Sequence, residues 1–81
     1  MKHAREDYDR IQDPAGLIPE NEPVFLIRGQ DLAAPEALRA YAVLAHSKGA
    51  SIELVAATLG HARQMEAWQR LVAPKIPDLP E

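Results

Sequence analysis

Apolar residues recur every three or four positions in two stretches of the chain. In the first stretch the repeating positions are Ala34, Leu38, Tyr41, Ala42, Leu44 and Ala45. In the second stretch they are Ile52, Val55, Leu59, Ala62 and Met65, followed by Trp68 or by Leu71 and Val72. This spacing predicts two amphipathic helices, over residues 31–48 and 52–73. Because only two or three residues separate them, the helices are expected to lie antiparallel.

Residues with end-of-helix preferences flank both stretches. Asp31 is expected to cap the first helix with its carboxylate, and Pro35 falls in the first turn, where a missing N–H costs nothing. Gly49 suits the left-handed position after a helix, and Ser51 is expected to cap the second one. Pro74 stops the second helix.

The predicted hairpin has little bulk with which to fill a core. Alanines dominate the positions where the helices face each other: Ala42, Ala45, Ala56 and Ala62. Gly60 costs ~1 kcal/mol against alanine inside a helix, which predicts close packing or a functional neighbour there. A chain of 81 residues buries only about 60% of its unfolded surface. We therefore expect a homo-oligomer that covers leftover apolar side chains, among them Phe25, Ile27, Trp68 and Ile76.

The remaining segments complete a single, mainly all-α domain over residues 1–81. Residues 3–12 predict a short helical arm with Tyr8 on its packed face, and residues 13–16 predict a turn. A loop and an extended segment are expected over residues 13–30. The β-type run at residues 24–27 is expected to lie against the helices or to pair with a neighbouring subunit. Residues 74–81 predict an extended tail anchored by Ile76 and Leu79.

Composition limits the function more than it identifies it. The chain has no cysteine, and its 9 basic and 12 acidic side chains give a net charge of −3. Binding to DNA or RNA usually requires a basic excess, whereas a compact phosphorylated anion needs only a few local cations. No apolar run approaches the ~18–20 residues that cross a bilayer, and the N-terminus lacks a signal-peptide block. We expect a cytoplasmic protein that binds no membrane.

Signatures of catalysis are missing from the sequence. It contains no glycine-rich phosphate loop, no nucleophile elbow and no metal-ligand spacing. The histidines His3, His46 and His61 are scattered, and although two could meet across the hairpin, surface or interface positions explain them as well. We expect no enzyme, no metal site and no cofactor.

Two candidates for ligand binding precede the hairpin. Tyr8 lies between Arg5 and Arg10, and an aromatic ring beside guanidinium groups can stack on a base while the cations hold a phosphate. Tyr8 could equally anchor the arm to the hairpin. Arg28 could pair with Asp31 to shape the turn before the first helix, or it could project into a ligand pocket.

The other candidates lie on the second helix and just after it. Arg63 and Arg70 are seven residues apart, two turns along one face, which suits either a phosphate clamp or a solvated surface. Lys75 follows the helix and could complement its dipole or contact a ligand.

Four short motifs resemble a known family. They are Tyr8-x-Arg10-Ile-x-Asp-Pro, Ile18-Pro-x-x-Glu22-Pro-Val-Phe-Leu-Ile-Arg-Gly-Gln-Asp31 with Ala34-Pro35, Met65-x-x-Trp68, and Lys75-Ile-Pro-Asp78. Together they resemble phage proteins of the second anti-CBASS type, which are cyclic-oligonucleotide sponges. The most specific block lies between Glu22 and Asp31.

The resemblance implies a homohexamer that sequesters cyclic dinucleotides and trinucleotides of CBASS immunity without cleaving them. It implies that Tyr8 stacks on a base, and that Arg63, beside Lys75, serves a separate trinucleotide site. The family also uses a lysine after the arm, where this chain has Pro23 and Val24, so Arg28 is the nearest substitute. The competing hypothesis is a small phage-encoded oligomeric adaptor or structural protein that binds another protein.

Overall fold

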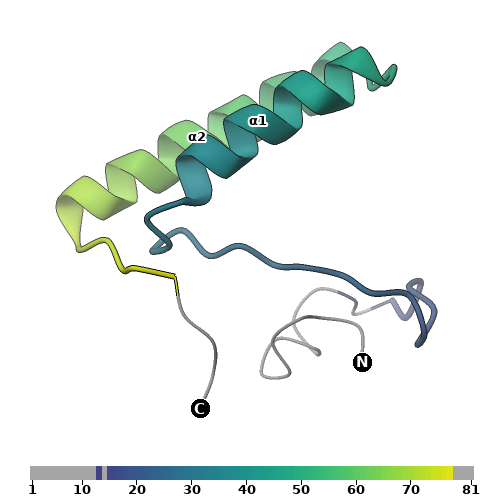
Figure 1. Cartoon of the computed structure of the whole chain (residues 1–81), viewed down its shortest axis with the longest axis horizontal. Coiled ribbons are helices and arrows are strands. Elements are labelled where there is room, and N and C mark those ends of the chain that lie inside the picture. Colours follow the sequence, from purple (N-terminus) through teal and green to yellow (C-terminus); the bar gives the residue numbers. More distant parts are fainter. Residues whose placement is uncertain (1–12, 14, 78–81) are drawn as a thin grey trace. The chain divides into compact units, whose positions relative to one another are not determined.

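The computed structural model describes residues 13 and 15–77. Within that part the regular structure consists of two α-helices, α1 (Ala34–Ser47) and α2 (Ile52–Leu71), with no strand. The helices pack side by side and antiparallel (Figure 1). The predicted helical hairpin is therefore confirmed. Residues up to 27 and residues 28–77 form separate units, and each is described by itself.

Helix α1 begins at Ala34, three residues after the predicted start, and Asp31 is not its N-cap. The N-cap is Ala33, which makes no side-chain cap bond. The carboxylate of Asp31 instead accepts a hydrogen bond at 2.8 Å from the N–H of Ala33, the residue directly before the helix. The early start was wrong because Pro35 has no N–H to donate to the carbonyl of Asp31, which accepts instead, in a turn, from the N–H of Ala34 at 2.9 Å. The N–H of Leu32 donates to the carbonyl of Lys75 at 2.8 Å.

The turn between the helices follows the sequence prediction. Gly49 has a φ of +93°, in the left-handed region that glycine occupies without steric cost. The N–H of Ala50 donates to the carbonyl of Ala45 at 2.9 Å, which satisfies one of the free carbonyls at the end of α1. Ser51 caps α2, since its hydroxyl oxygen accepts from the N–H of Leu54 at 3.1 Å. Helix α2 ends at Leu71, two residues before the predicted end.

The core of the hairpin is thin, as the alanine-rich sequence predicted. Among the described residues, the buried hydrophobic ones are Ala34, Ala42 and Ala62, and no large side chain is fully buried. Close packing at Gly60 is not observed: a Cβ added there would find only a guanidinium nitrogen of Arg63, 3.9 Å away. Within the single chain, no neighbouring helix therefore requires a glycine at this position, and close packing against another copy stays a prediction.

The segment before the hairpin begins with the predicted turn. The carboxylate of Asp13 accepts hydrogen bonds from the N–H groups of Leu17 and Ile18, at 2.8 and 3.1 Å. Gly16 adopts a φ of +65°. Residues 24–27 form no strand, and Phe25 is 70% exposed in the single chain. Their predicted contact with the helices or with a neighbouring subunit stays a prediction, and the arm at 3–12 lies outside the described residues.

The tail returns to the start of the hairpin through its backbone. The N–H of Lys75 donates to the carbonyl of Gln30 at 2.7 Å, and the carbonyl of Lys75 accepts from Leu32. These bonds form an isolated parallel bridge. Ile76 is 76% exposed in the single chain, so its side chain is not the anchor. The prediction of Ile76 was wrong because the main chain of Lys75 makes the attachment; Leu79 lies outside the described residues.

Candidate ligand-binding site

The segment that precedes α1 crosses the C-terminal part of α2 and is held there by Gln69. The side-chain amide nitrogen of Gln69 donates to the carbonyl of Gly29 at 3.0 Å and to the carbonyl of Asp31 at 2.7 Å. A primary amide has two N–H donors, so each carbonyl receives one. Gln69 is half-buried, where losing such a pair of bonds is costly.

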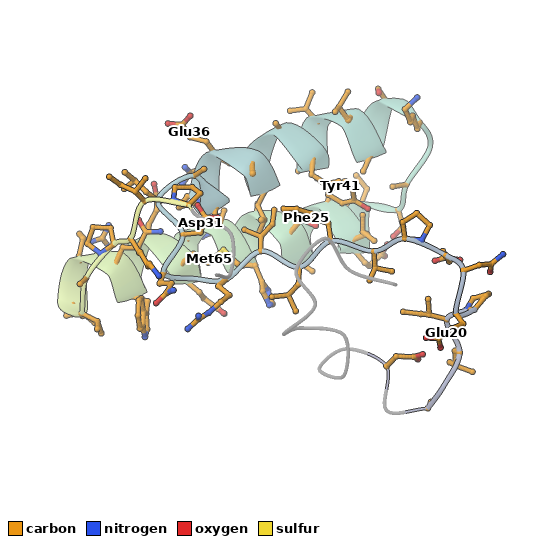
Figure 2. The ribbon with its side chains drawn as sticks, turned by 60° about the horizontal axis from the view of Figure 1, so that its bottom comes forward. Glu20, Phe25, Asp31, Glu36, Tyr41 and Met65 are labelled. Carbon is orange, nitrogen blue, oxygen red and sulfur yellow. The ribbon has the colours of Figure 1, made fainter. Side chains whose placement is uncertain are left out.

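Met65 supports the same segment one helical turn earlier. A Cβ built on Gly29 would lie 3.7 Å from the Cγ of Met65, which is ordinary van der Waals contact. Figure 2 shows Met65 close to the segment that carries Asp31. Residues 29–31 therefore lie across one face of α2, between an apolar contact and a polar one.

Arg28 and Lys75 belong to the two segments that meet here. A turn closes after Arg28, because its carbonyl accepts from the N–H of Asp31 at 3.0 Å. Asp31 and Lys75 then face each other in the parallel bridge. Both Arg28 and Lys75 are exposed. The predicted turn is confirmed in the backbone, whereas the two roles considered for the Arg28 side chain stay open.

Arg63 is not part of this crossing. It is exposed on α2, six residues before Gln69, which corresponds to ~9 Å along the helix axis. Arg70 is exposed as well. Tyr8, the candidate base-stacking residue, lies outside the described residues. Of the four candidate residues, the structure thus pairs Lys75 with the segment that directly follows Arg28 and leaves Arg63 on a separate part of α2.

A second polar contact joins the two helices directly. The guanidinium of Arg39 on α1 donates to the carboxylate of Glu66 on α2. This hydrogen bond lowers the pKa of Glu66, and the nearby positive charges of Arg39 and Arg70 lower it further. The same bond raises the pKa of Arg39. The side chains are 42% and 38% exposed, so solvent screens the pair and its stabilisation is small.

The sequence did not predict three residues that organise this region: Gln69, Arg39 and Glu66. Gln69 lies four residues after Met65 and seven after Ala62, so it continues the inward-facing stripe of α2. A polar amide on that stripe indicates a buried polar partner. Arg39 and Glu66 each follow an apolar stripe position by one residue, which puts them at the edge of the interhelical contact, but no sequence rule pairs them.

Within residues 13 and 15–77, no three histidine, aspartate or glutamate side chains gather closely enough to hold a metal ion. His46 and His61 are both exposed. No helix in this part of the chain combines the length and apolar character needed to cross a membrane. In comparisons with known proteins, no family model, no curated protein and no solved structure matches the chain.

Proposed function

We propose that this protein is an anti-defence sponge, which binds cyclic dinucleotides and trinucleotides and holds them without cleaving them. The observation that carries the proposal is the backbone pairing of the segments that contain Arg28 and Lys75. It brings two cationic residues from the two ends of the hairpin sequence to one end of the folded hairpin. The motif resemblance described above supports the same function.

A pair of cations fits a small phosphodiester better than a long nucleic acid. Guanidinium and ammonium groups form charge-assisted hydrogen bonds with phosphate oxygens, and one cyclic dinucleotide carries two phosphates. The overall charge of −3 provides no general attraction for DNA or RNA. In this proposal, as the resemblance implies, Tyr8 stacks on a base of the ligand, and Arg63 serves a second site for trinucleotides.

Oligomerisation belongs to the same proposal. Large apolar side chains stay exposed on the single hairpin: Leu32, Tyr41, Val43, Leu44, Ile52, Leu54, Trp68, Leu71, Val72 and Ile76. A thin core and so much exposed apolar surface favour association of several copies, for which we propose a hexamer. Sites formed where copies meet would also enclose a ligand more fully than one hairpin can.

Binding is tested by calorimetry with a panel of 3′,3′-linked cyclic dinucleotides and cyclic trinucleotides. We expect heat on binding, and mass spectrometry of the ligand after denaturation should recover it intact. Arg28→Met, Lys75→Met and Tyr8→Ala should each weaken dinucleotide binding roughly tenfold or more, the scale of a lost charge-assisted hydrogen bond or stacking contact. Lys48→Met is the matched control, since Lys48 is an exposed lysine at the opposite end of the hairpin. No heat with any member of the panel would refute the sponge.

The exposed apolar residues also favour a second candidate, an oligomeric adaptor that binds another protein. A single partner protein that co-purifies in fixed ratio, and whose binding Tyr8→Ala leaves intact, would support the adaptor. Release of a cyclic oligonucleotide from freshly purified protein would support the sponge instead.

A further inference from the structure

We infer that Gln69 is a positioning residue: it latches residues 29–32 between α2 and the tail, and thereby fixes Arg28 relative to Lys75. The ligand-related part of this inference rests on the proposed function; the latch itself does not. The turn bonds from Asp31 to Arg28 and from Ala34 to Asp31 shape residues 28–34 locally, but they do not hold them against α2.

The latch follows from where the backbone groups of residues 29–32 find their partners. These residues lie in two successive turns, since the N–H of Asp31 bonds to the carbonyl of Arg28 and the N–H of Ala34 bonds to the carbonyl of Asp31. On one edge of this segment, the carbonyls of Gly29 and Asp31 both accept from Gln69. On the other edge, the carbonyl of Gln30 and the N–H of Leu32 both bond to the main chain of Lys75.

Both edges of a single short segment are therefore occupied, one by a side chain and one by a backbone. This arrangement substitutes for the neighbouring strands that a sheet would provide, in a part of the chain where no sheet is present. Met65 adds an apolar contact below Gly29. Of the hydrogen bonds, those from the Gln69 amide are the ones that a single substitution can remove while the backbone pairing with Lys75 remains chemically available.

The consequence concerns the two cations. Arg28 directly precedes the latched residues, and Lys75 forms one of the two edges. A ligand that bridges both cations gains affinity when their spacing is already set, because less conformational entropy is lost on binding. Releasing Gln69 should loosen that spacing without removing either charge.

The test uses three substitutions in the full chain that differ in what they can donate. Gln69→Met keeps the length but removes both donors, Gln69→Glu presents a carboxylate to two carbonyls, and Gln69→Lys restores donors on a chain of similar reach. Amide hydrogen exchange of Leu32 and Lys75, whose N–H groups bond across the latch, is the readout. The same three substitutions at Gln64, an exposed position on α2, are the matched controls.

A latch predicts that exchange at both amides speeds up roughly tenfold in Gln69→Met. It should speed up more in Gln69→Glu, and Gln69→Lys should stay close to the original protein. If Gln69 only fills space, Gln69→Met will behave like the original protein and both charged variants will exchange fast. This second ranking of the exchange rates would overturn the latch, as would equal exchange rates in all variants.

Ligand binding is measured separately, with a cyclic dinucleotide of guanosine and adenosine and with Gln69→Met, which adds no charge. We expect roughly tenfold weaker binding in Gln69→Met, unchanged binding in Gln64→Met, and the same helix content by circular dichroism. Equal affinity despite faster exchange would overturn the positioning role. If the original protein binds no cyclic oligonucleotide, the sponge proposal is refuted. The ranking of amide exchange rates among the Gln69 variants then decides by itself whether the latch exists.

Discussion

Single side chains at the edge of the hairpin make its interhelical polar contacts. Arg39 and Glu66 form the direct ion pair between α1 and α2, and Gln69 joins α2 to the segment before α1. None of these residues contributes an apolar side chain to the core. They set the alignment of elements that pack mostly through alanine, and small residues alone specify alignment poorly.

The ion pair makes stability depend on acidity. The pKa of Glu66 is lowered from its ordinary value of 4.5 in the folded chain, so its contribution is complete above the unfolded pKa and is lost as pH falls through the folded one. We expect Glu66→Gln to flatten the loss of stability below about pH 4.5. Urea midpoints measured from pH 7 to pH 3 test this. Glu22→Gln removes a loop carboxylate and should leave the profile unchanged; an identical effect of both substitutions would contradict the prediction.

At the scale of the element, the two helices begin in different ways. Ser51 caps α2 with its side chain, whereas the N-cap of α1, Ala33, makes no side-chain cap bond. Ser51→Ala should lower the free energy of unfolding by ~1 kcal/mol, and Ser51→Asp should retain it, because aspartate accepts the same N–H. Equilibrium denaturation of the two variants measures the difference. Equal losses in both would mean that the cap contributes little.

Two glycines of the hairpin should respond in opposite ways to alanine. Gly49 has a left-handed φ of +93°, so Gly49→Ala should destabilise the fold by ~1 kcal/mol or more, although nothing lies within 4 Å of the added Cβ. Gly60 is helical with room for a Cβ, so Gly60→Ala should stabilise by ~1 kcal/mol. Thermal unfolding tests both. Destabilisation by Gly60→Ala would indicate that another copy packs closely against that position.

At the scale of the whole molecule, the buried hydrophobic residues described in one hairpin are alanines, whereas many of its large apolar side chains are exposed. If copies associate as proposed, the melting temperature should rise with protein concentration, because unfolding then includes dissociation. Leu44→Glu places a charge among exposed apolar residues of α1 and should favour dissociated chains. Glu53→Gln serves as a control of similar size on the polar surface. A melting temperature that stays constant over a hundredfold range of concentration would contradict association.

How far the sequence predicts the structure depends on the range of each interaction. The inter-helix turn was correct because Gly49 and Ser51 act on neighbours within four residues. The start of α1 was misplaced because the carbonyl of Asp31 accepts from Ala34 and from the distant Gln69, and Pro35 has no N–H with which to bond it in a helix. Of the candidate site, the turn between Arg28 and Asp31 was predictable, whereas Gln69 was not.

By itself, the sequence determined two amphipathic helices, the tight turn that makes them antiparallel, and the shortage of core volume. These follow from spacing, end preferences and side-chain size, which are local properties. Only the tertiary structure decided that Gln69 bonds to Gly29, 40 residues away, and that the tail pairs with the start of the hairpin. Such contacts depend on which backbone edges the folded chain leaves open, and no local pattern records that.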